Sequence, residues 1–588
     1  MQRSPLTDGE SPAVDAPALL PTRRSMLGLG AVALASVTGC TGAGQPPLGT
    51  AGESATPTPG APVKFTFGAS GAAETLDPAL VADTDSLRIT RQIFEGLVGV
   101  DPNTGAPTPG LATAWKSSGD GLTHTFALRR NVVFHDGTTF DADAVVTNFA
   151  RWAALHRKLG GLAGQAFESV FHHSDLPAEG DADPEDEAGG EDGSAVPGGS
   201  YYGGCRAQDA GTFVLELRKP LTGLIEALTL PGFGMASPRA LRELDADHPA
   251  DDGFGRSVSP FGKRPVGTGP FVFAAQEDTS VTLKANPNHW RDDGQIDSVT
   301  FEVLRDAPSR LRALRRGTVD GYDMVTLEEL RDLVRAGQQV LQRDPFSVLY
   351  LGMNQSNPRL ASADVRRAAA HAVNRQQLIE RYFIAGTKEA RGFVPPSLGV
   401  PNAETYHGYN PSMANELLEA SGYDGEPIPF LYPLNATRAY LPLPERIYAE
   451  LSSQLTEVGF NIKPVPIGWS EGYVDTVLSG RTAGFHLLGW NGSYRDPDHF
   501  IGSLFGTLSA QFGHDSAELR TMVVAARSMP NGDDRAAAYQ RIGELVAKDL
   551  PALPIAFPIS AVAVSDRVVS YPSSPVLDEV MDRVTLAT

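Results

Sequence analysis

The chain has 588 residues and is too long to fold around one hydrophobic core, because single cores stop growing at roughly 250–300 residues. Its composition, 41% apolar and 20% charged, is typical of a soluble globular protein. The net charge of −21 disfavours nucleic acid as a partner, since phosphates need a basic surface, and it also disfavours simple electrostatic docking on anionic lipid.

The N-terminus has the features of an export signal. A twin-arginine pair, Arg23-Arg24, precedes an apolar run from Met26 to Gly39, which is shorter than the about 20 residues needed to span a bilayer. The run ends in Val37-Thr38-Gly39-Cys40, which resembles a lipobox, where cleavage leaves a cysteine that takes a lipid. We therefore expect a Tat-type lipoprotein signal peptide over residues 1–39.

Cys40 is accordingly the expected lipidation site, and the Gly/Pro-rich residues 40–62 are the expected flexible tether. The mature protein would be exported and lipid-anchored on the outer face of the cytoplasmic membrane. Cys205 then has no cysteine left to pair with, so no intrachain disulfide is expected.

Strands and helices alternate along the rest of the chain. Period-two patterns predict strands at 63–67, 123–128, 212–217, 271–273, 281–285, 298–304, 462–467 and 485–489. Helices are predicted at 85–97, 141–152, 308–316, 364–383, 410–420, 444–458 and 471–478. This alternation predicts an α/β fold.

The segment 175–204 lacks periodicity and holds nine acidic residues with no Lys or Arg between Asp175 and Asp192. We expect a disordered acidic surface insertion there. The neighbouring His172 and His173 are interpreted as solvated loop residues rather than metal ligands, and metal-ligand types do not cluster elsewhere. No metal and no cofactor is expected.

One motif would favour an enzyme. Gly468-Trp469-Ser470-Glu471-Gly472 matches the G-x-S-x-G nucleophile elbow, and Asp496 followed by His499 or His514 gives the chain order of a Ser–Asp–His triad. A secreted serine hydrolase using Ser470 is therefore the alternative function. The main interpretation treats Ser470 as the N-cap of the helix that starts at Glu471, and the protein as not an enzyme.

An ordered series of short segments, each weak alone, covers about residues 63–560. The segments are 75–78 (TLDP), 92–98 (QIFEGLV), 111–115 (LATAW), 121–129 (GLTHTFALR), 133–137 (VFHDG), 141–145 (DADAV), 265–271 (PVGTGPF), 286–290 (NPNHW), 315–320 (RRGTVD), 351–354 (LGMN), 365–368 (VRRA), 372–375 (AVNR) and 489–498 (GWNGSYRDPD). Together they resemble the bacterial extracellular solute-binding proteins of family 5, the peptide-, dipeptide- and nickel-binding lipoproteins of ABC importers.

The resemblance implies a two-lobed periplasmic-binding-protein (type II, Venus-flytrap) architecture with an extra subdomain in lobe I. Lobe I would comprise residues 63–304 and 559–588, and lobe II residues 305–558, with crossings near Leu304 and at 556–559. It implies a substrate-binding lipoprotein that captures a small solute, an oligopeptide or peptide-like compound, by hinge closure. The expected partners are this solute and an ABC permease, with the membrane reached through the lipid on Cys40. We expect a monomer.

The resemblance also bears on the ligand. In peptide-binding members, an Asp three residues after the Trp of the Gly-Trp motif pairs with the free α-amino group, whereas this chain has Ser493 there. A free-amine peptide is therefore in doubt, and Asp496 is a possible substitute from the same loop. The expected ligand-binding residues are Ser70 and Gly71 in lobe I, and Arg391, Trp490, Asn491, Ser493, Tyr494 and Asp496 in lobe II. Tyr432 is a further candidate.

Overall fold

The computed structural model describes residues 62–81, 83–159, 164–173, 199–248, 250–251, 257–291 and 294–587. The predictions for the signal peptide, for Cys40 and for the tether before Pro62 therefore lie outside the described residues. Pro59–Thr588 forms one compact unit. Within the described ranges, no helix combines the length and the apolar character needed to cross a membrane.

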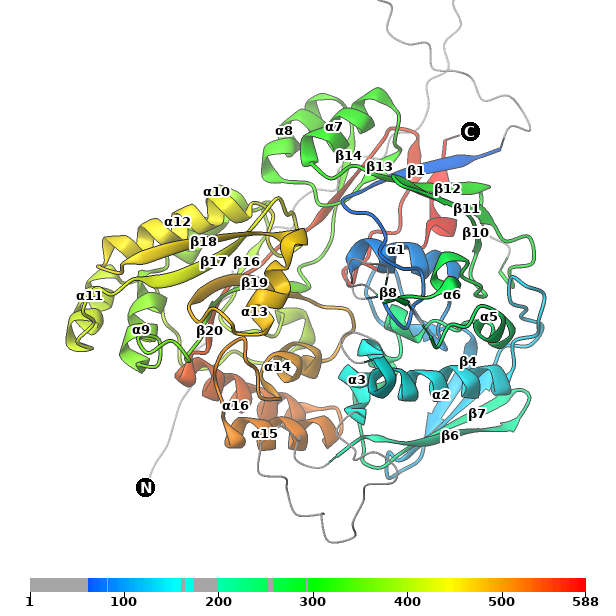
Figure 1. Ribbon diagram of the computed structural model, residues 1–588, viewed down its shortest axis with the longest axis horizontal. Coiled ribbons are helices and arrows are strands. Elements are labelled where there is room, and N and C mark those ends of the chain that lie inside the picture. Colours follow the sequence, from blue (N-terminus) through cyan, green and yellow to red (C-terminus); the bar gives the residue numbers. More distant parts are fainter. Residues whose placement is uncertain are drawn as a thin grey trace, which may run out of the picture. The chain divides into compact units, whose positions relative to one another are not determined.

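A mixed seven-stranded sheet organises the first part of the chain (Figure 1). Its central strand β1 (Lys64–Ala69) pairs in parallel with two neighbours, and its alternating Phe65 and Phe67 are fully buried. The sheet order is β10 (Phe271–Glu277), β11 (Ser280–Ala285), β12 (Ser298–Val303), β1, β13 (Gly321–Tyr322), β21 (Ala561–Val564) and β14 (Gln339–Gln342).

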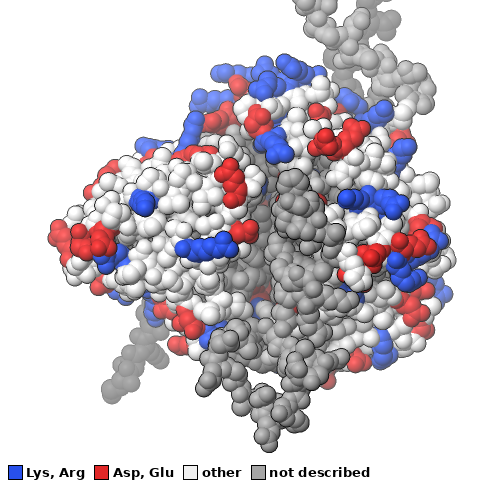
Figure 2. Space-filling view, in the orientation of Figure 1, with Lys and Arg blue, Asp and Glu red and all other residues white. Residues whose placement is uncertain are grey.

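Five helices pack with this sheet or follow its strands. They are α1 (Thr84–Ile93), α5 (Pro238–Glu243), α6 (Pro260–Lys263), α7 (Ala307–Arg316) and α8 (Leu327–Arg335). The helix α7 ends where Gly317 adopts a left-handed conformation (φ 69°), as its Gly predicted. Figure 2 shows basic side chains gathered over α7 and α8, where Arg312, Arg315, Arg316 and Arg335 are exposed. The acidic net charge is therefore not spread evenly over the surface.

A second, four-stranded antiparallel sheet forms a subdomain with its own core. Its order is β4 (Ala112–Ser117), β5 (Thr123–Leu128), β7 (Thr212–Leu217) and β6 (Tyr202–Asp209). Three helices belong with it: α2 (Ala142–Leu159), α3 (Gln165–Phe171) and α4 (Leu224–Ala227). Asp141 accepts a hydrogen bond from the Ala144 amide at 3.0 Å, which confirms it as the cap of α2. We call this subdomain and the seven-stranded sheet region lobe I.

Three two-stranded ribbons complete this part of the described chain. They are β2 (Val98–Val100) with β3 (Pro107–Pro109), β8 (Ala250–Asp251) with β9 (Ser257–Val258), and β22 (Val568–Ser570) with β23 (Thr585–Leu586).

A mixed six-stranded sheet organises the region that we call lobe II. Its order is β16 (Lys388–Glu389), β20 (Ala552–Phe557), β15 (Ser347–Met353), β19 (Phe485–Asn491), β17 (Ile428–Leu434) and β18 (Ile462–Gly468). Every residue of β15 and β20 is buried, since helices cover both faces. The helices are α9 (Ala363–Ala372), α10 (Arg375–Tyr382), α11 (Pro411–Ala420), α12 (Pro444–Glu457), α13 (Tyr473–Leu478), α14 (Pro497–Phe505), α15 (Ala517–Ser528) and α16 (Asp533–Asp549).

The chain passes between the two large sheets at residues 343–346 and 558–560. The second passage overlaps the predicted crossing at 556–559. The first does not lie near Leu304, because residues 305–342 supply β13 and β14 to the sheet of lobe I rather than to lobe II. Strands of two and four residues carry almost no periodic signal, so only their pairing reveals where they belong.

Three other local predictions are wrong. The single helix predicted at 364–383 is two helices, because Val373 is extended and Asn374 caps α10 by accepting from the Gln377 amide. In the acidic insertion, residues 174–198 lie outside the described residues, but residues 202–204 already belong to β6, which follows the buried Tyr201. His173 is buried against Ser200 (Nδ1 to Oγ, 3.0 Å) and is not a solvated loop residue.

Candidate functional site

Two polar atoms at the end of β19 lack partners. Trp490 Nε1 and Asn491 Oδ1 are buried, and neither meets a hydrogen-bond partner among the described residues. An unsatisfied buried donor or acceptor costs about 1–3 kcal/mol, so such groups are rare unless something else satisfies them. Because the side chains of consecutive strand residues point to opposite faces, the two atoms mark two separate polar positions on β19. Other described residues also have such atoms, and this pair is notable because both lie among the residues that the sequence predicted to bind the ligand.

Gly489, the residue before this pair, allows a neighbouring ring to approach β19 closely. A Cβ at Gly489 would lie 2.3 Å from the ring of Tyr440, so the Gly allows that ring to pack directly on β19. Burial raises the pKa of the Tyr440 phenol to about 12, although the Arg438 charge lowers it. Arg438 lies over the Trp469 ring at 4.0 Å from its centroid. The segment 438–440 thus joins the end of β18 to the end of β19.

Ser493 and Tyr494 follow the pair in the loop before α14. The Ser493 amide donates to His499 Nε2 at 2.9 Å, and burial lowers the pKa of His499 to about 3, so this imidazole is a neutral acceptor. The Tyr494 ring packs on His499 (4.1 Å between centroids) and lies within the core of the lobe I subdomain. Tyr494 therefore packs between the two lobes, with its ring buried.

Asp496 is already fully engaged. Its carboxylate accepts two hydrogen bonds from Arg535 at 2.8 and 2.9 Å, and it caps α14 through the Asp498 amide at 2.8 Å. Burial raises its pKa, while the hydrogen bonds and charge of Arg535 lower it. Asp496 and Tyr494 border a small cavity with Arg527 and Arg535, away from the Trp490 ring. Asp496 is therefore poorly suited to replace the missing charge at Ser493.

On the lobe I side, Ser70 and Gly71 follow the carboxyl end of β1 and contact a residue that the sequence did not single out. The Ser70 hydroxyl donates to Asp85 Oδ2 at 3.0 Å, and its amide lies 3.2 Å from Oδ1. A Cβ on Gly71 would lie only 2.7 Å from Asp85 Oδ2, so Gly keeps that oxygen open on one side. Burial raises the pKa of Asp85, opposed by the charges of Arg88 and of Arg438 in lobe II.

Residues 106–512 match the family described as "Bacterial extracellular solute-binding proteins, family 5 Middle", which is more than half of the chain. The chain belongs to this family of solute-binding proteins. It is 25% identical to heme-binding protein A of Haemophilus influenzae over 518 residues (85% of this chain, 88% of that protein). It is also 25% identical to the dipeptide-binding protein of Escherichia coli over 491 residues (81% and 84%).

Solved structures confirm the two-lobed fold of this solute-binding protein. The Helicobacter pylori periplasmic binding protein DppA, in complex with the peptide STSA, gives a TM-score of 0.75 at 23% identity over 90% of this chain and 98% of that chain. The dipeptide-binding protein of Pseudoalteromonas sp. SM9913, in complex with Met-Leu, gives 0.76 at 19% identity over 89% and 100%. At these identities the likeness establishes the fold.

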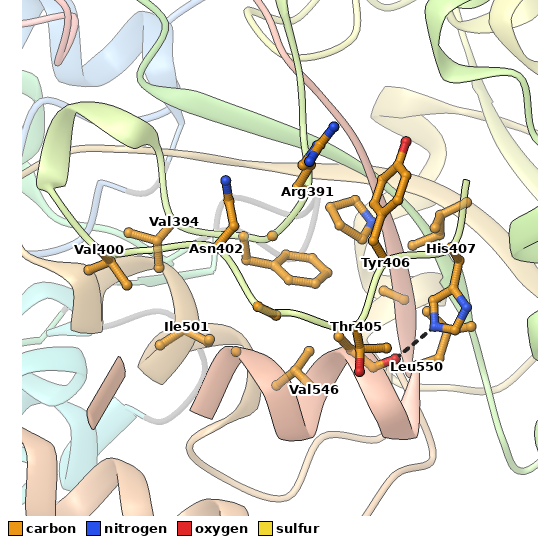
Figure 3. A pocket seen from close by; sticks show the side chains of 18 of the residues that line it. Arg391, Val394, Val400, Asn402, Thr405, Tyr406, His407, Ile501, Val546 and Leu550 are labelled. Atoms are coloured by element: carbon orange, nitrogen blue, oxygen red, sulfur yellow. Dashed lines mark hydrogen bonds between the residues drawn. The ribbon is translucent and has the colours of Figure 1, made fainter. Parts of the chain in front are cut away.

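Two predicted ligand residues of this family 5 protein lie elsewhere in lobe II. Arg391 is exposed and lies over the Tyr406 ring (4.7 Å), at a cavity between the 391–407 segment and the helices α14 and α16 (Figure 3). Figure 3 shows Ile501, Val546 and Leu550 lining it, and the cavity shares no residue with the Trp490 loop. Tyr432 stacks on Tyr448 of α12 at 3.7 Å, so its ring already has a partner.

The geometry around Ser470 does not favour a hydrolase. Ser470 is not a helix cap as predicted: it lies inside the short 3-10 helix Trp469–Glu471, which Gly468 precedes. His499 accepts from the Ser493 amide, His514 lies 3.1 Å from Asp549, and Asp496 is bound to Arg535. The residues of the candidate triad are thus engaged elsewhere. The relatives above are solute-binding proteins, which favours a non-enzymatic role.

Arg438, Trp469 and Asp85 are functional candidates that sequence reasoning missed. Arg438 lies in a loop, Trp469 follows the end of β18, and Asp85 lies in the first turn of α1. Asp85 opens a predicted helix and Trp469 follows a predicted strand, whereas Arg438 follows no predicted element. Their proximity is a product of tertiary structure. Among the described residues, no group of three or more His, Cys, Asp or Glu side chains is arranged to hold a metal ion.

Proposed function

We propose that this protein captures a peptide or peptide-like solute between its two lobes and delivers it to the permease of an ABC importer. The observation that carries the proposal is the unsatisfied pair Trp490 Nε1 and Asn491 Oδ1 in a member of this family. A carbonyl oxygen of the solute would accept a hydrogen bond from the indole Nε1. Relatives with dipeptide-binding and glutathione-binding names support the solute class.

Capture would occur by hinge closure about the two crossing segments, 343–346 and 558–560. Motion of this kind needs only a few residues to change their backbone angles, while each sheet moves as a rigid body. Binding then changes the relative position of the lobes, which is what a permease can recognise. No covalent step is required, so the protein acts as a carrier rather than an enzyme.

We further propose that the protein is exported and held at the membrane by a lipid on Cys40, with residues 40–62 as the tether, and that it works as a monomer. The motif Val37-Thr38-Gly39-Cys40 supports this proposal. A Cys40→Ala variant should be released from the membrane fraction, while the wild type stays there after a high-salt wash. Retention of the variant would contradict the lipid anchor.

The solute class is tested with protein purified under native conditions. Small molecules released by denaturation are identified by mass spectrometry, and peptide and non-peptide panels are compared by thermal shift. A ligand at a hundredfold excess over its Kd stabilises the folded state by about 2.7 kcal/mol. Stabilisation by peptides is the expected result. Stabilisation by sugars or metal chelates alone would contradict the proposed class.

A further inference from the structure

We propose that Asp85 of lobe I binds the cationic end, an ammonium or guanidinium group, of the peptide-like solute. This inference rests on the proposed function, and it adds which residue of the protein binds the positive charge of the solute. Asp85 lies in the first turn of α1, which starts just after the connection from β1. Ligands of α/β sheets bind beyond the carboxyl ends of parallel strands, and β1, β12 and β13 all end at this edge.

The Asp85 carboxylate is oriented but not neutralised by contact. Ser70 contributes its amide and hydroxyl, which leaves part of the four lone-pair positions of a carboxylate free. Within the described residues, no Lys, Arg or His nitrogen forms an ion pair with it at 4.0 Å or less. Other half-buried or buried acids nearby differ: Asp323 and Glu579 are each paired with both Arg88 and Arg343.

Gly71 makes the free side of this carboxylate approachable. A Cβ at position 71 would lie 2.7 Å from Asp85 Oδ2. It would therefore occupy the space that a group bound to this oxygen needs. The Gly has a backbone φ outside the left-handed region, so chain conformation alone does not explain its presence. Ser70 and Gly71, first singled out by their position after β1, are therefore best understood as the support of Asp85.

A complementary charge comes from lobe II. The charge of Arg438 lowers the pKa of Asp85, and among the described residues the two form no ion pair at 4.0 Å or less. Opposite charges on facing lobes suit a solute with a cationic and an anionic end. The cation would lie at Asp85 and the anion at Arg438. Closure would then be favoured only when both ends are present.

The alternative role for Asp85 is the common one of an acidic residue at a helix N-terminus, where it interacts with the helix dipole. Asp143 provides the matched control, because it is an exposed acid in the first turn of α2, in the subdomain. A purely helical role predicts the same small loss of stability for Asp85→Asn and Asp143→Asn, with no change in binding. The proposed role predicts a change in binding for Asp85→Asn alone.

The test uses two pools of the same dipeptides, one with free amino groups and one N-acetylated, with binding measured by calorimetry. We expect Asp85→Asn to weaken binding of the free-amine pool at least tenfold relative to wild type, with the acetylated pool and the Asp143→Asn protein unchanged. Ser70→Ala, which leaves the charge but removes one hydrogen bond, should give a smaller loss.

If Asp85→Asn binds both pools as wild type does, or loses both equally, the inference is wrong while peptide binding stands. If wild type binds neither pool, both the proposed peptide class and the inference fail. If wild type binds only the acetylated pool, the solute carries no ammonium at this position and the inference alone is overturned. Circular dichroism of each variant shows whether a loss comes from unfolding.

Discussion

The amide of Arg343 donates to the carbonyl of Ser560 at 2.9 Å, and this bond joins the two segments that cross between the lobes. The side chain of Arg343 is fully buried and reaches into lobe I, where it binds Glu579 and Asp323 at 2.6 and 2.7 Å. Arg88 binds the same two acids. Each acid therefore has two cationic partners, and the two crossing segments are joined to each other and to lobe I at their lobe I ends.

Loss of one member of this network should destabilise the fold strongly. Removing one partner of a buried pair leaves an uncompensated charge, at a cost of about 3–5 kcal/mol. We expect Arg343→Met to lower the free energy of unfolding by that amount in urea denaturation. Arg335→Met, where 80% of the side chain is exposed, is the control and should change it by less than about 0.5 kcal/mol. Equal effects would show that the network contributes little.

Acid should weaken the protein through buried neutral histidines. Burial lowers the pKa of His486 and of His499 to about 3, far below the ordinary histidine value of 6.5. Between pH 6.5 and 3 the unfolded chain therefore binds protons that the folded chain does not, so stability falls as the pH falls. Each His contributes a slope of up to about 1.4 kcal/mol per pH unit in this window.

Urea denaturation from pH 7 to pH 4 measures this slope. His486→Gln should be less stable at pH 7, because it disturbs a packed site beside Gln511 and Tyr350, but it should lose part of the pH dependence. An unchanged slope would mean that His486 is protonated in the folded protein. The exposed His248 provides the control, since His248→Gln should alter neither quantity.

The lobes also touch far from the crossing segments. The Thr222 amide of lobe I donates to the Arg527 carbonyl at 3.0 Å, and its hydroxyl donates to the Met529 carbonyl at 2.7 Å. Arg527 itself binds His172 of lobe I and Asp498 of lobe II, the latter at 2.7 Å. These contacts join the two lobes directly.

Thr222→Val should therefore shift the protein towards an open form. The lost hydroxyl bond corresponds to about 1 kcal/mol, or roughly a fivefold change in the ratio of closed to open molecules. Small-angle scattering without solute should give a larger radius of gyration than wild type, and added solute should restore the wild-type value. Thr521→Val, on the exposed side of α15, should have no effect. An unchanged radius in Thr222→Val would contradict the role of this contact.

Trp490→Phe isolates the unsatisfied donor. The variant keeps an aromatic ring but lacks Nε1, so solute affinity should fall about fivefold to tenfold, as expected for one hydrogen bond of about 1–1.5 kcal/mol. Stability without solute should not fall by a comparable amount, because the donor has no partner in the described chain. Trp115→Phe in β4 is a control outside the site. Equal affinity for Trp490→Phe and wild type would remove Trp490 from the binding residues.

Sequence alone determined the features that depend on local patterns. The strands at 123–128 and 212–217 were predicted with their observed bounds. In a strand, side chains alternate between the two faces of the sheet, so a strand with one buried face shows apolar residues at every second position. Caps such as Asp141 and Gly317 were equally local. The ordered motifs identified the family, since they extend over most of the chain.

Tertiary structure alone decided the charges at the site and the division between the lobes. Asp85 and Arg438 are about 350 positions apart in the sequence, and no local pattern predicts that one acts on the other. Likewise Asp496 resembled a free ligand until Arg535 was found bound to it, and residues 305–342 resembled lobe II until β13 and β14 paired with lobe I. Periodicity reports which face of an element is buried, but partner choice depends on contacts between distant segments, which sequence spacing does not encode.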